Sequence, residues 1–287
     1  MHKSQSYFHD LNGLRYHVRC WGDAKAPTLF LLHGWMDASA SFQFVVDQLQ
    51  RDWRVIAPDW RGCGLSGRPV GGYWFPDYYA DLDALLDLYS PDEPARLVGH
   101  SMGGVIACTY SGLRPQRVAK LVSLEGFGLT RTQPADAVPR LRSWLDELKQ
   151  TQRFRSYTSI ESFAARLRSE NPRLDEIRAL AVALAWAKQD GEDHVELLHD
   201  PRHKRINPVL FRLEELLACW RECTAPALWV FARDSKGSGY LNDTPEQLAE
   251  RKAAFRDYHE AWVEDAGHMM HHDQPAAVAK LIEGFVG

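Results

Sequence analysis

Gly99-His100-Ser101-Met102-Gly103-Gly104, residues 99–104, matches the pattern G-x-S-x-G. An apolar run at residues 95–98 precedes it, and an apolar helical pattern at residues 103–113 follows it. The glycines suit a turn too tight for side chains, and the unpaired N–H groups that begin a helix favour a developing anion. This context predicts that Ser101 is a nucleophile at a strand-to-helix turn. The alternative is a glycine-rich connection that carries a solvated serine.

The chain on both sides of this turn alternates between short apolar runs and helical patterns. Continuous apolar runs are typical of strands buried on both faces of a parallel sheet. We expect such strands at residues 28–32, 54–57, 95–98, 120–124, 227–231 and 260–263, and helices at residues 42–50, 76–89, 103–113 and 275–285. A hairpin that turns at Asn12-Gly13 comes before them. The alternation predicts an α/β fold with a doubly wound, mostly parallel sheet.

One interval, residues 129–224, interrupts the alternation. It carries amphipathic helical patterns and no convincing strand, and we expect helices at residues 136–152, 159–170, 172–188 and 208–222. Thr158 and Glu161 resemble a capping box at the start of the second helix. We therefore predict a core domain of residues 1–128 and 225–287, with residues 129–224 inserted as a helical cap.

Composition and charge exclude several classes of protein. The 287 residues are 45% hydrophobic and 25% charged, as in ordinary globular proteins. The net charge of −4 comes with no basic stripe, so nucleic acid is not an expected partner. No apolar stretch approaches the roughly 20 residues of a membrane helix, and residues 1–10 are too polar for a signal peptide. We expect a cytoplasmic protein without a membrane span, and the sequence carries no signal for an oligomeric state.

Neither a metal nor an organic cofactor is expected. The five cysteines are odd in number and scattered without a CxxC pair, which favours reduced thiols. The sequence shows no phosphate-binding loop and no convergent set of metal ligands. His271 and His272 are adjacent, and adjacent side chains on a helix point to different faces, so we expect them at the surface or against the cap and not in a joint metal site.

Four motifs together resemble the α/β-hydrolase superfamily in their order and separations. They are His33-Gly34-Trp35, the run from Asp59 to Ser66, the Ser101 motif and Gly267-His268-Met269. The resemblance covers nearly the whole chain and includes esterase-like and serine-hydrolase-like members. The helical interval occupies the place of that superfamily's cap.

The resemblance implies roles for particular residues. A serine hydroxyl is a weak nucleophile until an imidazole takes its proton, and His268, between the last strand and the last helix, stands where the superfamily carries this base. The backbone N–H groups of Trp35 and Met102 would form the oxyanion hole.

We do not expect the other histidines near the motifs or in the inserted interval to act as the base. We place His33, Gly34 and His100 at the substrate pocket, with His33 in a structural hydrogen bond and His100 packed beside the nucleophile. His199 and His203 are expected in a turn or at the surface of the inserted interval.

Two carboxylates are candidates for the acid that orients the histidine. The superfamily's commoner position, after the penultimate strand, falls on Ser235, and Asp234 lies one residue early. Neighbouring side chains near a strand end point in opposite directions, so this offset matters. Glu125 ends the preceding strand without any offset, as in some dehalogenase-like members, and a buried carboxylate there needs a charged partner. We favour Glu125 and keep Asp234 as the alternative.

Ester hydrolysis through an acyl-enzyme on Ser101 is the predicted reaction, because dehalogenases and epoxide hydrolases of this superfamily carry an aspartate at that position. The expected partner is a small-molecule ester or thioester with a small to medium apolar acyl group. Two alternatives stay open: a C–C bond hydrolase or lyase on the same fold, and a ligand-binding protein with vestigial hydrolysis.

Overall fold

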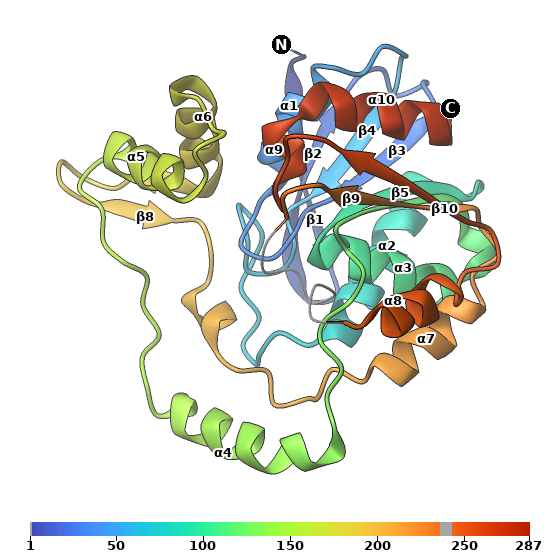
Figure 1. Ribbon diagram of the computed structural model, residues 1–287. Helices are drawn as coiled ribbons and strands as arrows, with labels where there is room; N and C mark the ends of the chain where they lie inside the picture. Colours follow the sequence, from blue (N-terminus) through green and yellow to red (C-terminus); the bar gives the residue numbers. More distant parts are fainter. Residues whose placement is uncertain (1, 236–242) are drawn as a thin grey trace.

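A mostly parallel sheet forms the centre of the molecule (Figure 1). The computed structural model describes residues 2–235 and 243–287. The sheet has eight strands in the order β1-β2-β4-β3-β5-β6-β9-β10. Their bounds are β1 Ser4–Leu11, β2 Leu14–Trp21, β3 Thr28–Leu32, β4 Arg54–Pro58, β5 Ala95–His100, β6 Val118–Leu124, β9 Ala227–Ala232 and β10 Tyr258–Val263. The predicted doubly wound sheet is confirmed, since β1 and β2 form the expected antiparallel hairpin and the strands from β4 to β10 run parallel.

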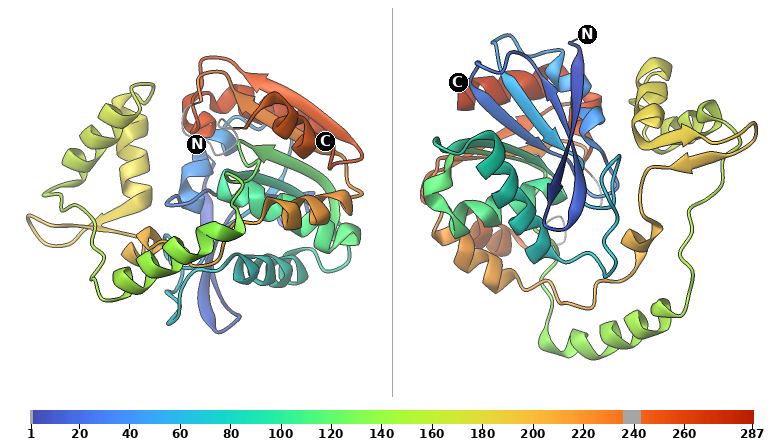
Figure 2. Two further views of the ribbon diagram at one scale, coloured as in Figure 1. Left: turned by 60° about the horizontal axis from the view of Figure 1, so that its bottom comes forward. Right: turned by 180° about the vertical axis from the view of Figure 1, so that it is seen from behind.

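Helices cover both faces of this sheet (Figures 1 and 2). On one face α2 (Phe75–Tyr89), α3 (Met102–Leu113) and α7 (Leu213–Arg221) bury apolar side chains against the strands. On the other face α1 (Gln43–Val46) and α10 (Pro275–Val286) do the same. The short helices α8 (Pro245–Lys252) and α9 (Met270–Asp273) were not expected from the sequence, and α1 is shorter than the helix predicted at residues 42–50.

The segment between β6 and β9 stands where the insertion is expected, and its role as a cap stays a prediction. It contains α4 (Ala137–Leu148), α5 (Ile160–Glu170) and α6 (Glu176–Trp186), and it then pairs β7 (Ala187–Gln189) with β8 (Val195–Leu197). The two short strands correct the expectation of helices only, because the helix predicted to reach residue 188 ends at Trp186 and the chain continues extended.

Two further details of the insertion differ from the sequence prediction. Ser159 and not Thr158 caps α5, because its hydroxyl accepts a hydrogen bond from the Ser162 N–H at 3.1 Å. Helix α7 packs with the core, since Leu217 and Trp220 share a buried cluster with Trp229 of β9. We therefore propose that the cap ends before α7 and not at residue 224.

Two other features of the described residues bear on the sequence predictions. All five cysteines carry free thiols. Among the helices within residues 2–235 and 243–287, none combines the length and the apolar character that crossing a bilayer requires.

Burial changes the pKa of five of the histidines around the carboxyl ends of the strands. They are His33, His100, His199, His203 and His272. Burial disfavours the charged imidazolium, so the pKa falls below 6.5 for all five, to about 4 for His203 and about 3 for His272. These imidazoles are therefore neutral at pH 7.

The surface position expected for His199 and His203 is wrong, because the segment after β8 packs against the loops that follow β3 and β4. His199 Nε2 lies 3.0 Å from the Asp37 carbonyl, and His203 Nε2 lies 3.1 Å from the Arg61 carbonyl. His272 is buried against Trp186 of α6, which agrees with the expected cap contact.

We predict that the free energy of unfolding falls as the pH drops below about 6.5. The unfolded chain takes up protons on these imidazoles near that pH, whereas the folded chain does so only at lower pH, so acid favours unfolding. Each such histidine should cost about 1.4 kcal/mol per pH unit until its folded pKa is reached. Carboxylates, whose unfolded pKa is near 4, act below this range.

Urea unfolding at a series of pH values between about 7 and 5 measures this slope. The variant His272→Gln should reduce this slope by the contribution of one histidine. Equal slopes for the wild type and His272→Gln would contradict the prediction.

Candidate active site

Ser101 occupies a strained turn between β5 and α3. Its backbone has φ 50° and ψ −117°, in a region that L-residues rarely adopt. The turn is held by a hydrogen bond of 2.9 Å from the Ser101 N–H to the Leu124 carbonyl of β6. At Gly103 an added Cβ would lie 2.2 Å from the Leu32 carbonyl oxygen, so only glycine lets α3 approach β3 this closely. The sequence therefore presents the Ser101 hydroxyl above the carboxyl edge of the sheet.

The imidazole of His268 meets this hydroxyl. His268 lies in the loop between β10 and α9, and its Nε2 lies 3.0 Å from Ser101 Oγ. The His268 side chain is 32% exposed, so solvent and a small molecule can reach it. The structure thus brings together the two residues that the sequence singled out as nucleophile and base.

Glu125 lies on the other side of the imidazole. It follows β6 with φ 55°, and its side chain is fully buried. One carboxylate oxygen, Oε1, accepts a hydrogen bond from the Ala232 N–H at 2.9 Å. The other, Oε2, lies 2.5 Å from the Ser235 hydroxyl and 3.5 Å from His268 Nδ1. The last distance is long for a hydrogen bond, as is common before substrate tightens a site.

Asp234 does not join this group. It is exposed, and its carboxylate pairs with the Arg173 guanidinium of the insertion at 2.6 Å. The one-residue offset seen in the sequence explains this, because Ser235 points toward Glu125 and its neighbour points away. Ser235 itself was not predicted as a site residue, although it stands at the superfamily's commoner acid position.

The backbone near Ser101 supplies donors for an anion. Met102 begins α3, where N–H groups have no partner within the helix. The loop after β3 lies against Ser101, since a Cβ added at Gly34 would lie 3.2 Å from the Ser101 Cβ. Trp35 follows directly in this loop and is 53% exposed. The two residues expected to form an oxyanion hole therefore belong to backbone segments next to Ser101.

His33 and His100 lie beneath the site and do not border its cavities. His33 Nε2 accepts a hydrogen bond of 2.8 Å from the Trp60 N–H, in agreement with the structural role expected for it. His100 Nε2 lies 2.8 Å from the carbonyl oxygen of His268, so it holds the loop of the base. Gly34 also stays out of the cavity lining. All three residues are buried, and the substrate-pocket position expected for them stays a prediction.

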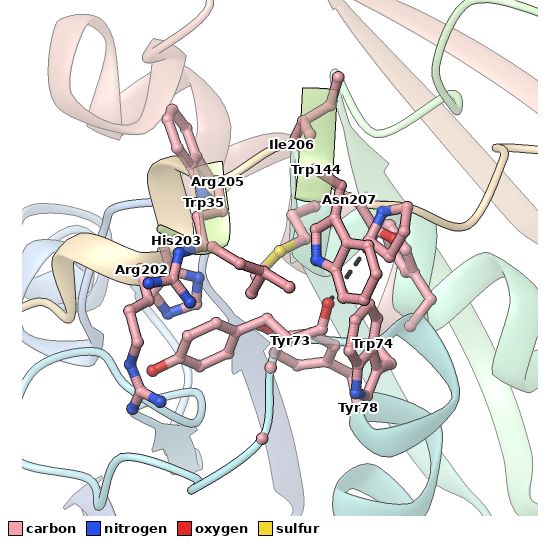
Figure 3. Close-up of a pocket in the computed structure, with 16 residues that line it drawn as sticks. Trp35, Tyr73, Trp74, Tyr78, Trp144, Arg202, His203, Arg205, Ile206 and Asn207 are labelled. Atoms are coloured by element: carbon pink, nitrogen blue, oxygen red, sulfur yellow. Dashed lines mark hydrogen bonds between the residues drawn. The ribbon is translucent and has the colours of Figure 1, made fainter. Parts of the chain in front are cut away.

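An aromatic cavity of about 370 Å³ begins at Trp35 and Met102 (Figure 3). Its walls come from the loop before α2, from α4 and from the segment that follows β8. The lining includes Tyr73, Trp74, Phe75, Tyr78, Trp144, Leu148, Arg202, His203, Arg205, Ile206, Asn207 and Pro208. Trp144 is thus one of the aromatic residues of the insertion that reach a cavity and not a helix core.

A polar cavity of about 860 Å³ opens on the side of His268. Ser235, Asp234 and Arg173 line it together with Gly267 and His268. His268 thus lines the polar cavity, whereas Trp35 and Met102 line the aromatic one.

Comparisons with known proteins agree with the geometry. Residues 27–275 match the family model described as alpha/beta hydrolase fold. A serine hydrolase-like protein of Danio rerio is 28% identical over 93% of this chain and 83% of that protein. A serine hydrolase-like protein of Dictyostelium discoideum is 23% identical over 96% of this chain and 79% of that protein.

One solved structure matches nearly the whole of this chain. The thioesterase domain from the curacin biosynthetic pathway superimposes with a TM-score of 0.86 at 25% identity, over 98% of this chain and 99% of that domain. Since the family model spans most of the chain and both core halves around the insertion, this chain belongs to the alpha/beta hydrolase fold family.

Proposed function

We propose that this protein hydrolyses carboxylic esters or thioesters of apolar acyl groups through an acyl-enzyme on Ser101. The observation that carries the proposal is the chain of contacts from Ser101 Oγ through His268 to Glu125. Membership of the hydrolase family and the similarity to serine hydrolase-like proteins support it.

The contacts allow each proton to be followed. His268 Nε2 takes the proton of Ser101 as Oγ bonds to the acyl carbon. The negative charge moves to the former carbonyl oxygen, which the N–H groups of Trp35 and Met102 would hold. Glu125 stabilises the imidazolium, and His268 then gives its proton to the departing alcohol or thiol. Water repeats the sequence to release the acid and restore Ser101.

The cavities favour an apolar acyl group. The aromatic cavity is lined by Trp35 and Met102, beside the expected oxyanion position, and six aromatic side chains contribute to its walls. A space of about 370 Å³ lies within the usual range of small-ligand sites. The thioesterase domain that shares the fold supports including thioesters among the substrates.

The first test of this function concerns Ser101. The variant Ser101→Ala should lose ester turnover and labelling by a fluorophosphonate, because both reactions require its hydroxyl. Turnover of p-nitrophenyl esters and the mass of the labelled protein measure the two effects. Labelling of the wild type without ester turnover would favour the alternative of C–C bond cleavage, and unchanged labelling of the variant would remove Ser101 from the mechanism.

The second prediction separates the two carboxylates. Glu125→Gln should lower kcat by about 10³–10⁴-fold, because the imidazolium loses its charge partner. Asp234→Asn should change kcat by less than about threefold, since an exposed ion pair contributes little. Each variant removes one negative charge, so the two are matched. A larger loss of kcat in Asp234→Asn than in Glu125→Gln would refute the assignment of Glu125 as the acid.

A transplanted acid gives a sharper form of this test. Because the Ser235 hydroxyl lies 2.5 Å from Glu125 Oε2, an aspartate at position 235 should place a carboxylate near the same point. The double variant Glu125→Ala with Ser235→Asp should recover at least about tenfold in kcat over Glu125→Ala alone, a recovery of about 1.4 kcal/mol in the barrier. No recovery in a folded double variant would show that position 235 cannot serve the imidazole.

The third prediction concerns the acyl group. Trp144→Ala should enlarge the aromatic cavity and raise kcat/KM for p-nitrophenyl decanoate relative to the butyrate by about tenfold or more. Trp262→Ala removes an exposed tryptophan that does not border this cavity and should leave the ratio unchanged. An unchanged ratio in Trp144→Ala would place the acyl group elsewhere.

A further inference from the structure

Three buried residues that the proposed reaction does not use directly converge below Ser101 and His268. They are Asp37 in the loop after β3, His100 at the end of β5 and His271 in α9. Each offers one ligand atom, and these three atoms lie within 4.8 Å of one another. All three residues are at most 1% exposed. Two imidazoles and a carboxylate thus share a site away from bulk water.

The carboxylate of Asp37 is fixed in direction. Its Oδ1 accepts hydrogen bonds from the Ala38 N–H at 2.7 Å and the Trp186 indole N–H at 2.8 Å. Its Oδ2 faces His271 Nε2 at 3.2 Å. Although burial acts in the opposite direction, the contact with His271 and the nearby histidines hold the pKa of Asp37 well below its usual value. One oxygen is therefore anchored, and the other points as an anion into the cluster.

His100 presents a lone pair beside this anion. Its Nε2 lies 2.8 Å from the carbonyl oxygen of His268 and must donate there, so the proton is on Nε2 and Nδ1 keeps the lone pair. Within the part of the chain that the structure describes, this buried Nδ1 has no hydrogen-bond partner, and neither has Nδ1 of His271. A buried lone pair without a donor is costly in a protein interior. The cluster thus offers more acceptors than donors.

We propose that Asp37, His100 and His271 form a binding site for a divalent transition-metal ion such as Zn²⁺. Nitrogen of imidazole and oxygen of carboxylate are the ligands that zinc takes in sites with three protein ligands, with a water in the fourth position. Bonds of about 2.0–2.2 Å require ligand atoms about 3.3 Å apart. The separation of 3.2 Å between Asp37 and His271 meets this requirement, and the ligand atom of His100 lies within 4.8 Å of both.

The charges and the connections of the site agree with this occupant. Because His100 donates from Nε2 to a carbonyl oxygen, its Nδ1 carries no proton and can bind a metal. A divalent ion with one carboxylate leaves a net charge of +1 in the site. The ion would join the loop after β3, β5 and α9, and through Trp186 and Asp37 also α6 of the insertion. Binding should therefore stabilise the fold, whatever the reaction at Ser101.

The experiment uses the full chain expressed in medium supplemented with zinc, because the site is buried. Native mass spectrometry after dialysis counts the retained metal, and Zn²⁺ titration of chelator-treated protein gives the affinity. We expect one zinc ion per chain, a higher melting temperature with zinc, and a Co²⁺ form with visible absorption but without a thiolate charge-transfer band.

Matched variants locate the metal. Asp37→Asn keeps an oxygen for the Ala38 and Trp186 donors but loses the charge, and His271→Gln loses a ligand. Both should weaken Zn²⁺ binding by roughly 10–100-fold or more. His272→Gln removes the neighbouring buried histidine, and His268→Gln removes the candidate base. Neither residue belongs to the cluster, so both variants should bind Zn²⁺ with the affinity of the wild type.

Three results would overturn the proposal. They are wild-type protein that retains no zinc, Asp37→Asn and His271→Gln that bind zinc with unchanged affinity, and a Co²⁺ spectrum of thiolate ligands. Circular dichroism checks that each variant folds, and the metal content and Co²⁺ spectrum of the wild type decide the outcome even where a variant does not. Binding is measured without substrate, so a failure of the proposed ester hydrolysis leaves this test intact.

Discussion

The contact of 3.0 Å between Ser101 Oγ and His268 Nε2 joins two loops that are far apart in the sequence. It can form only because parallel strands bring their carboxyl ends to one edge of the sheet, where β5 and β10 both end. The cap, the aromatic cavity and the buried histidines all lie around this edge. The contact therefore constrains the order of the strands, the length of both loops and the position of the insertion.

The acid illustrates how the sheet register selects a residue. Leu124 pairs with Val230 across β6 and β9, so Glu125 and the residues after Ala232 end their strands next to each other. A carboxylate from either strand can then reach the same space. Here Glu125 fills it, and Ser235 at the end of β9 contributes a hydroxyl that the carboxylate accepts. The same geometry can thus be built from two strands, and the local register decides which one supplies the charge.

The parts of the fold that depend on local pattern could be predicted from the sequence, and the parts that depend on long-range packing could not. Apolar runs between glycines located the strands and the turn at Ser101, as the structure confirms. The burial of His199 and His203 follows from the packing of the segment after β8 against the distant loops that follow β3 and β4, which periodicity does not report. The convergence of Asp37, His100 and His271 was missed for the same reason, since three separate segments meet there. The sequence predicted a helix where α7 lies but assigned it to the inserted interval, whereas α7 packs against the core.

Backbone strain gives an independent reason to regard this edge as the working part of the molecule. Besides Asn12 in the hairpin turn, the described non-glycine residues with positive φ are Met36, Ser101, Glu125 and Asp265. Each of the four lies just beyond a strand of the central sheet, next to an expected oxyanion donor, at the candidate nucleophile, at the candidate acid or in the loop of the candidate base. Such conformations cost about 1–3 kcal/mol each and persist only where packing enforces them. Their gathering at one edge indicates that the core's stability holds this arrangement in place, because a relaxed backbone would move the hydroxyl, imidazole and carboxylate apart.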